Sequence, residues 1–574
     1  MTVITPNALR VLEARYLLKD EHGGVKEKPE ELFRRVSRAV AAAEKLYHKD
    51  AAYWEERFFD LMSSLRFLPN SPTLMNAGKD LGQLAACFVL PVEDSMEGIF
   101  DTLKHAALIL QSGGGTGFSF SHLRPRADRV QSTGGIASGP VSFMKIYNTT
   151  TDVIKQGGAR RGANMGILRI DHPDIMEFIK IKRKESELAN FNISVSVTDA
   201  FFEALNKGGK FELKNPRTLQ TIGSLDAREV FEEIVKSAWL TGDPGLVFID
   251  RINRDNPTPL LGNMESTNPC GEQPLLPYEA CILGSLNLSK YVRDSVLESN
   301  TPSVDYVQLE QDIRVAVRFL DDCIDINKYP LPAIEKMHKG NRKIGLGVMG
   351  WADMLVLMGI PYDSASALEL GERVMRFVRD TARDESARLA KEKGAFPNFI
   401  GSKFDEPGMP LLRNATTTTV APTGTLATIA DCSSGIEPYF GLAYKRYIVH
   451  SEFVEINAYL FSLAKKRGWY SNRLEHEVIR KGTLRGIRAV PADIRNLFKT
   501  ALEINYRTHI EMQAVFQKYT DNAVSKTINM PQSATKKDVA EAFLLAYEKG
   551  CKGITIFRYG SKKKGTLVRF ADAD

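Results

Sequence analysis

Apolar positions are spaced differently in the first 70 residues and in the remainder of the chain. In VSRAVAAAEKLYHK (36–49) and AAYWEERFFDLMSSL (51–65), apolar residues recur about every 3.6 positions among good helix formers. Beyond residue 70, short apolar runs alternate with segments of helical spacing. The pattern predicts a helical N-terminal region over residues 1–70, followed by alternating strands and helices.

The alternation is clearest between residues 117 and 205. The expected elements are a strand at GFSF (117–120), a helix at PVSFMKIYNTTTDVIKQGG (140–158), a strand at ANMGILRI (163–170), a helix within 172–184, a strand at FNISVSV (191–197) and a helix at TDAFFEAL (198–205). Pro140 and Gly158 are typical first and last residues of a helix. Thr198 or Asp199 is the expected N-cap of the last helix.

The same alternation continues to the end of the chain. ATTTTVAPTGTLATIA (415–430) predicts a strand, a tight loop and a helix, and GITIF (553–557) predicts a late strand. Strands separated by helices favour βα crossovers and a largely parallel sheet. Because no repeat or linker interrupts residues 71–560, we expect a single α/β barrel-like domain.

Composition excludes several classes of protein. The chain has 574 residues, is 43% hydrophobic and 25% charged, and carries a net charge of only +6, so neither disorder nor a nucleic-acid partner is indicated. No apolar run approaches the roughly 18 residues of a membrane span. The charged N-terminus does not fit a signal peptide, which favours the cytosol, where thiols stay reduced. The six cysteines form no CxxC pair, and no metal site is predicted.

Two glycine-rich motifs invite nucleotide-binding interpretations that their context does not support. IGLGVMG (344–350) matches GxGxxG, but a basic stretch precedes it and Asp363 lies in a loop, so close packing of backbone is the better interpretation. QSGGGTGFSFS (111–121) is followed by a strand instead of a helix and lacks a GK[ST] sequence. A close approach of another segment to its backbone is the expected use of these glycines.

Two further loops have residues suited to anions. APTGT (421–425) offers N–H groups and the hydroxyls of Thr423 and Thr425 at a predicted strand–helix junction, which suits phosphate but also fits an ordinary βα turn. QGGARRGANMG (156–166) places two arginines among glycines directly after Lys155. It is equally consistent with anion or base recognition and with a surface loop.

The segment STNPCGEQPLLPYEAC (266–281) has the most specific pattern. Cys270 lies between Asn268 and Glu272, and a second thiol, Cys281, follows eleven positions later. A neighbouring carboxylate raises a thiol pKa and suppresses the thiolate, so ordinary nucleophilic catalysis is disfavoured. The combination fits better if the sulfur reacts as a radical while the carboxylate takes a proton from a nearby hydroxyl. The alternative is a buried cysteine in a proline-bounded loop.

With these motifs the chain resembles the ribonucleotide reductases, most closely the dimeric adenosylcobalamin-dependent class. The resemblance is carried by blocks in one order: SPTLMNAG (71–78), ACFVLPVEDS (86–95), SGGGTGFSFS (112–121), STGGIASGPVSFM (132–144), QGGARRGANMG (156–166), NPCGE (268–272), PTGT (422–425), SSGIEPYF (433–440) and SKTINMP (525–531). It implies a ten-stranded α/β barrel over residues 71–574, with the thiyl cysteine on a central finger loop. Residues 1–70 show no sign of the family's ATP-binding activity domain.

The resemblance also implies catalytic roles. Cys270 becomes a thiyl radical and abstracts the 3′-hydrogen of the ribose, Glu272 takes the 3′-hydroxyl proton, and Asn268 hydrogen-bonds the ribose hydroxyls. Cys87 and Cys281 match the pair of thiols that supply two electrons by closing to a disulfide. If so, their Cα atoms lie within about 7 Å of each other.

Two binding sites follow from the same resemblance. The substrate-phosphate site is expected at Ser71, Pro422, Thr423, Gly424 and Thr425. An allosteric deoxynucleotide is expected at Asp94, Lys155, Gln156 and Arg160. The helix 140–158 and the following loop are expected at the interface of a homodimer, with control of specificity but no overall activity switch.

The source of the radical distinguishes the classes of reductase. Large subunits that receive a radical from a metal-containing subunit have adjacent tyrosines near the thiyl cysteine, whereas CKGITIFRYGS (551–561) has Phe557 and Tyr559. Direct use of adenosylcobalamin on ribonucleoside diphosphates is therefore the leading hypothesis. The alternatives are a radical-accepting large subunit and a catalytically silent nucleotide-binding homologue.

The family's usual cysteine-bearing tail is not found, because no cysteine follows Cys551. The expected reductant is a thioredoxin-type protein or a small dithiol.

Overall fold

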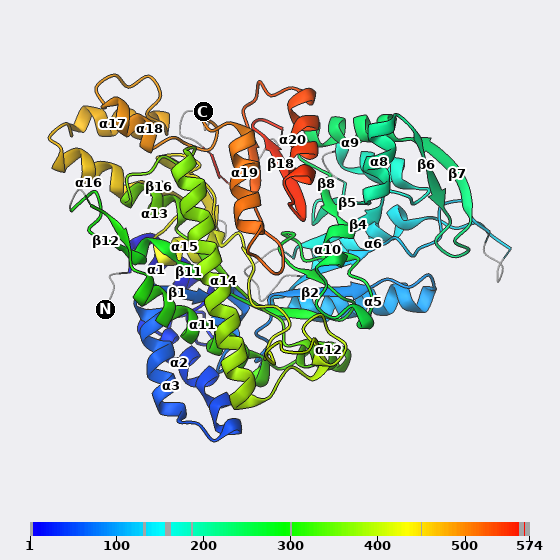
Figure 1. Cartoon of the computed structure of the whole chain (residues 1–574), viewed down its shortest axis with the longest axis horizontal. Helices are drawn as coiled ribbons and strands as arrows, with labels where there is room; N and C mark the ends of the chain where they lie inside the picture. Colours follow the sequence, from blue (N-terminus) through cyan, green and yellow to red (C-terminus); the bar gives the residue numbers. More distant parts are fainter. Residues whose placement is uncertain are drawn as a thin grey trace.

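The structure is a computed structural model that describes residues 4–129, 134–154, 162–184, 187–298, 301–448, 451–561 and 567–568. A ten-stranded sheet forms its centre, and helices surround that sheet (Figure 1). The strands of this sheet are β1 (Phe67–Pro69), β2 (Cys87–Pro91), β3 (Gly115–Ser119), β4 (Asn164–Arg169), β5 (Phe191–Val197), β8 (Gly245–Phe248), β11 (Ala280–Asn287), β14 (Ile344–Met349), β17 (Thr527–Met530) and β18 (Gly553–Arg558). The predicted α/β architecture with a helical N-terminal region is confirmed.

Nine of the ten strands form two parallel groups that run in opposite directions, and β1 pairs antiparallel with β11. One group is β2, β3, β4, β5 and β8, joined by parallel pairing throughout. In the other group, β11 pairs in parallel with β14, and β17 with β18. Antiparallel pairings of β11 with β2 and of β18 with β8 join the groups. The predicted, largely parallel sheet is therefore confirmed, with antiparallel pairing only where the groups meet and at β1.

The segment 416–420 links the two edges of this sheet. A single parallel bridge joins Leu346 of β14 to Thr418, and another joins Val420 to Val524, just before β17. This segment was expected to be a regular strand. It is not one, because the N–H groups of Thr417 and Thr418 donate to the Asp521 carboxylate instead of to a neighbouring strand.

Backbone contacts explain IGLGVMG. A Cβ added at Gly347 would lie 2.3 Å from the carbonyl oxygen of Thr419, and one at Gly345 would lie 2.6 Å from the Thr419 side chain. These glycines therefore allow the linking segment to lie directly against β14, and all six residues of β14 are buried. The predicted close packing is confirmed.

The N-terminal helices are α1 (Pro6–Arg15), α2 (Pro29–Ala41), the 3₁₀ helix η1 (Ala42–Tyr47) and α3 (Ala51–Ser63). They pack mainly against other helices, and α3 also contacts β1. In Figure 1, α2 and α3 lie beside α11 (Tyr306–Ile326), which in turn packs along α14 (Ala365–Lys393). The single helix expected at 36–49 is in fact the end of α2 followed by η1, whose final residues lead into the left-handed His48.

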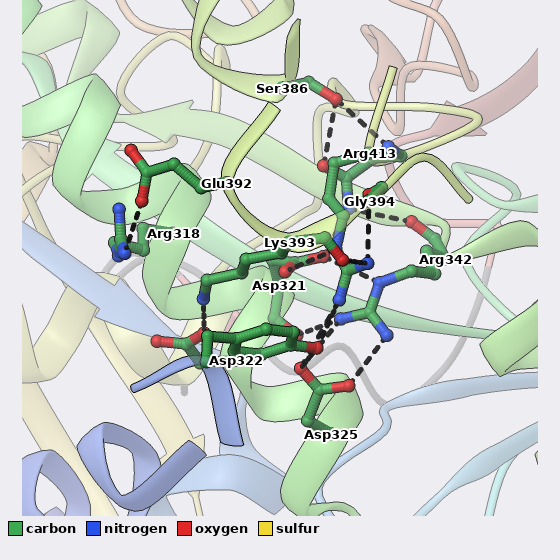
Figure 2. A network of polar contacts seen from close by, with 12 residues as sticks. Arg318, Asp321, Asp322, Asp325, Arg342, Ser386, Glu392, Lys393, Gly394 and Arg413 are labelled. Atoms are coloured by element: carbon green, nitrogen blue, oxygen red, sulfur yellow. Dashed lines mark hydrogen bonds and ion pairs between the residues drawn. The ribbon is translucent and has the colours of Figure 1, made fainter. Parts of the chain in front are cut away.

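A buried network of charges joins these layers (Figure 2). Glu44 of η1 pairs with Arg318 of α11 at 2.7 Å and with Lys393 of α14 at 2.7 Å. Asp322 also contacts Lys393. Burying these charges is tolerable only because each has a partner of opposite sign. The network therefore fixes η1 to the two long helices of the catalytic region.

Three carboxylates in the same network lie close enough together to attract a cation. They are Asp321, Asp322 and Asp325. Arg342 donates to Asp321 and Asp325, and Arg413 also donates to Asp321. Guanidinium groups thus occupy the place where a metal ion would bind.

The remaining helices cover the other strands. They include α5 (Met96–Gln111), α6 (Pro140–Val153), α7 (Ile175–Lys180), α8 (Asp199–Lys207), α9 (Ala227–Thr241), α15 (Gly424–Ala430), α19 (Tyr506–Gln517) and α20 (Lys536–Glu548). Thr198 caps α8 by accepting from the N–H of Phe201, as predicted. Among the described residues, no helix is long and apolar enough to cross a membrane.

Candidate active site

The sequence NPCGEQ forms a finger at the centre of the sheet. Its base is a short antiparallel pair, β9 (Ser266–Thr267) and β10 (Pro274–Leu275). Residues of β9 contact β2, β3 and β4. Gly271, at φ +80°, takes a left-handed conformation that permits the tight turn after Cys270.

Glycines in β3 make room for this finger. A Cβ at Gly117 would lie 1.7 Å from the carbonyl oxygen of Thr267, a distance that no substitution could accommodate without displacing β9. A Cβ at Gly115 would lie 3.0 Å from the ring of Pro269. The glycine-rich motif 111–121 therefore allows the close backbone approach that its sequence predicted.

Hydrogen bonds from three segments of the chain hold the finger. Asn192 of β5 donates to the carbonyl of Pro269 at 2.7 Å. The carbonyl of Glu272 accepts from the N–H of Ala523 at 2.9 Å and from the Thr419 hydroxyl at 3.0 Å. Fixed in this way, the loop presents an exposed Cys270.

The two other thiols lie next to the finger. Cys87 of β2 and Cys281 of β11 are register partners in an antiparallel pair, and both are free and buried. Residues directly opposite each other in such a pair have Cα atoms about 4.5–5.5 Å apart, within the range of a disulfide. The Asn268 amide donates to the Cys87 sulfur at 3.0 Å. The structure thus brings together all five residues assigned to catalysis.

Electrostatics keep both buried thiols protonated. Burial raises the pKa of Cys87 well above its usual value, and the nearby Glu272 carboxylate raises it further. Burial also raises the pKa of Cys281, although the ammonium group of Lys343 acts in the opposite direction. A protonated thiol can supply a hydrogen atom or an electron together with a proton, whereas it is a poor nucleophile.

A cavity of about 330 Å³ lies on one side of the finger. It is lined by nine of the ten residues predicted for catalysis and substrate binding: Ser71, Cys87, Asn268, Cys270, Glu272, Pro422, Thr423, Gly424 and Thr425. Cys281, the tenth, lies directly behind Cys87. Residues separated by as much as 354 positions thus share one cavity, whose volume suits a small ligand.

The loop 422–425 has an unusual backbone. Thr423 is left-handed at φ +49° and immediately precedes α15. Its hydroxyl accepts from the N–H of Gly435 at 2.8 Å, within the SSGIEPYF block. This contact fixes a conformation that costs energy for a β-branched residue, as is common where a loop holds a ligand.

A second cavity, of about 460 Å³, lies on the other side of Cys270. Cys270, Pro269 and Pro422 border both cavities. Phe557 of β18 lies in the wall of this second cavity, and none of the described residues lining it is a tyrosine. Cys270 is therefore placed between two spaces, one beside the buried thiols and one beside β18.

The predicted effector residues are only partly described. Asp94 follows β2, lines neither cavity, and pairs with Arg124 at 2.8 Å. Lys155, Gln156 and Arg160 lie outside the described residues.

Some residues at the site were missed by sequence reasoning. Arg15 donates to the Thr425 hydroxyl at 3.3 Å, and the Tyr16 hydroxyl lies 2.8 Å from that of Ser71. Lys526, within the SKTINMP block, lines the second cavity and pairs with Glu437. The position of Lys526 within the SKTINMP block could have marked it as a site residue. Nothing in the sequence indicated that α1 would reach this site.

Comparisons with known proteins agree with this arrangement. The pattern of "Ribonucleotide reductase, barrel domain" matches residues 85–411 and 408–557, and that of "Ribonucleotide reductase, all-alpha domain" matches residues 3–82. The chain belongs to the ribonucleotide reductase family.

Individual relatives give a more specific comparison than the family patterns do. The vitamin B12-dependent ribonucleoside-diphosphate reductase of Thermoplasma acidophilum is 49% identical, over 98% of this chain and 80% of its own length. A protein of the same description from Mycobacterium tuberculosis is also 49% identical, over 98% of this chain and 79% of its own length. The class Id ribonucleotide reductase alpha subunit of Actinobacillus ureae has the same fold, with a TM-score of 0.77 at 23% identity over 97% of each chain.

Proposed function

We propose that this chain is an adenosylcobalamin-dependent reductase that converts ribonucleoside diphosphates to 2′-deoxyribonucleoside diphosphates. The observation that carries the proposal is the position of Cys270, between a cavity lined by Cys87, whose strand partner is Cys281, and a second cavity with no tyrosine among its described lining residues. The names of the two relatives at 49% identity support the same substrate and cofactor.

The residues around the first cavity suit the chemistry of a ribose. Cys270, as a thiyl radical, takes the 3′-hydrogen atom and becomes a thiol. The Glu272 carboxylate takes the proton of the 3′-hydroxyl, which allows the 2′-hydroxyl to leave as water. Asn268, fixed by the donation from the Gln273 N–H to its side-chain oxygen, holds the ribose hydroxyls beside Cys87.

Cys87 and Cys281 supply the electrons and protons that the reduction consumes. Replacing the 2′-hydroxyl by hydrogen, with release of water, requires two electrons and two protons, which the two thiols supply as their sulfurs join in a disulfide, while Glu272 returns its proton to the 3′-oxygen. Their raised pKa values keep the protons available at neutral pH. Cys270 then returns the hydrogen atom to the 3′-carbon. An external dithiol, either a thioredoxin-type protein or a small molecule, reduces the disulfide.

The second cavity has side chains that fit the corrin ring and its amide arms. Its wall includes Asn192 and Gln513, and the Gln513 side-chain oxygen is buried with no hydrogen-bond partner among the described residues. An amide N–H of the cofactor would satisfy that oxygen. When bound, adenosylcobalamin supplies a carbon-centred radical by homolysis of its cobalt–carbon bond. The exposed Cys270 is the residue of this chain that such a radical would meet first.

The proposal also covers allosteric regulation and the cellular compartment of the reaction. We assign a deoxynucleotide effector to Asp94 and to Lys155, Gln156 and Arg160, at the interface of a homodimer. We place the reaction in the cytosol, because a dithiol that must be re-reduced after each turnover requires a reducing compartment.

Single-turnover reduction tests this function. Purified protein is given adenosylcobalamin and CDP without any reductant, and dCDP is quantified. One dCDP per active site is expected, with further turnover after dithiothreitol is added. The Cys270→Ser variant should give none, whereas Cys432→Ser, a matched change outside both cavities, should behave like the wild type.

The same experiment separates the alternatives. Product that forms only after a metal-containing second subunit is added would show a radical-accepting large subunit. Binding of CDP without product under either condition would show a silent homologue.

A further inference from the structure

The end of helix α1 contacts the wall of the substrate cavity at two adjacent residues. Arg15, the last residue of α1, donates to the hydroxyl of Thr425 at 3.3 Å. Tyr16, fully buried, places its hydroxyl 2.8 Å from that of Ser71. Thr425 and Ser71 both line the cavity beside Cys270. The N-terminal helical region therefore reaches the two hydroxyls expected to bind the substrate phosphates.

The lining of this cavity has no positively charged side chain among its described residues, so the nearby guanidinium of Arg15 would be important for binding an anion. Glu272 is the only carboxylate among the described residues that line it, and these residues include no lysine, arginine or histidine. A diphosphate brings several negative charges, and burying them without a cation is costly. Because α15 has only seven residues, its N-terminus is a weak substitute for a charged side chain. A cation next to the lining would offset this cost.

We propose that Arg15 is the cation that binds the terminal phosphate of the substrate, and that Tyr16 positions Ser71 for the same phosphate. The inference rests on the proposed function and deepens it, since it names the residue that recognises a diphosphate. A guanidinium has five N–H donors in a planar fork, so a bond to Thr425 and a two-point contact with a phosphate are compatible. Arg15 is half-buried, so solvent screens its charge only partly.

The proposal gives the N-terminal region a role in substrate recognition. Contacts with the phosphates are independent of the base, so Arg15 should strengthen binding of all ribonucleoside diphosphates alike. Its effect should appear in substrate affinity and not in the chemical step, because the reacting carbons lie near Cys270.

Two glutamine variants on the same helix test the proposal. Arg15→Gln removes the cation, and Arg10→Gln makes the same change at an exposed position of α1. Binding of CDP and of pyrophosphate is measured by calorimetry without cofactor, and turnover is measured with adenosylcobalamin and dithiothreitol. Loss of a charge-assisted hydrogen bond predicts at least a ~10-fold weaker binding of both ligands to Arg15→Gln. The KM for CDP should rise in proportion, with kcat within about twofold of the wild type.

The outcomes separate this inference from the function it rests on. If Arg15→Gln binds CDP as Arg10→Gln does, while the wild type reduces CDP, Arg15 has no such role and the function stands. A lower kcat at unchanged KM would show a purely structural role. If the wild type binds no CDP, the proposed function fails, and the inference with it.

A measurement on the wild type covers the case in which Arg15→Gln does not fold. Phenylglyoxal, which modifies accessible arginines, is applied with and without CDP, and peptides are quantified by mass spectrometry. CDP should protect Arg15 but not Arg10. Equal labelling of Arg15 in both samples would overturn the proposal.

Discussion

The cysteines of this chain carry the same thiol group but differ widely in solvent exposure. Among the six cysteines, all of which are described, Cys270 is exposed, Cys432 is half-buried and the others are buried. Cys87 and Cys281 also have raised pKa values. Position in the fold, and not the thiol itself, thus separates the residue that we propose meets the radical from those that we propose supply electrons.

The rate of alkylation should differ between the exposed Cys270 and the buried Cys87 and Cys281. Iodoacetamide reacts with accessible thiolates, so at pH 8 Cys270 should be modified before Cys87 and Cys281. Peptide mass spectrometry measures the order, and in guanidinium all six cysteines should react. Early modification of Cys87 in the folded protein would contradict its burial.

His338 should make the stability of the protein depend on pH. It is fully buried, and desolvation lowers its pKa to about 3. Because this pKa lies below that of the unfolded chain, about 6.5, stability is complete above pH 6.5 and falls as the pH drops toward 3. Urea unfolding should show a loss of up to about 2 kcal/mol between pH 6.5 and 5 that is smaller in His338→Gln. An identical pH profile in that variant would exclude this role.

Neighbouring strands position the finger through close backbone approach and through side-chain hydrogen bonds to its carbonyl groups. Gly117 in β3 allows the carbonyl of Thr267 in β9 to approach, and Asn192 in β5 holds the carbonyl of Pro269. The finger therefore depends on the spacing between strands, and a single methyl group should disturb it.

Gly117→Ala tests that dependence. The added Cβ would lie 1.7 Å from the Thr267 carbonyl, so β9 must shift and Cys270 with it. We expect a destabilisation of about 1–3 kcal/mol and a loss of dCDP formation of at least ~10². Gly223→Ala, in the exposed strand β7 (Thr221–Asp226), meets its nearest atom at 3.9 Å and should change neither. Unchanged activity in Gly117→Ala would show that the finger tolerates displacement.

Local patterns predicted the elements well and their long-range partners poorly. Thr198 was identified as one of two candidate caps, and the glycines of both motifs were expected to allow close backbone approach. The meeting of Cys87 with Cys281 followed only from the resemblance. The contact of Arg15 with Thr425 spans 410 positions and has no local signal. The strand expected at 416–420 makes only single bridges, because a distant carboxylate, Asp521, accepts its N–H groups.

Across the whole molecule, the buried charges couple the N-terminal helices to the catalytic region. Glu44 bonds to Arg318 and Lys393, and these contacts lower its pKa to about 2. The same helical region places Arg15 and Tyr16 at the substrate cavity. We therefore expect changes in the N-terminal helices to affect both the stability of the protein and the proposed binding of substrate.

Glu44→Gln should weaken that coupling. It leaves two buried cations with one fewer anionic partner, which predicts a loss of about 3–5 kcal/mol in the free energy of unfolding. Glu56→Gln, at the surface pair with Arg34, should cost at most about 1 kcal/mol. Urea denaturation measures both. Equal losses would show that the buried network adds no more than a surface ion pair.

We propose above that Cys270 removes the 3′-hydrogen of the ribose. The most direct test is the reduction of CDP labelled with deuterium at the 3′-carbon, with adenosylcobalamin and dithiothreitol, compared with unlabelled CDP. We expect slower formation of labelled dCDP, with the deuterium retained mainly at the 3′-carbon, and no product with Cys270→Ser. Equal rates would leave the claim without kinetic support, and dCDP formation by Cys270→Ser would contradict it.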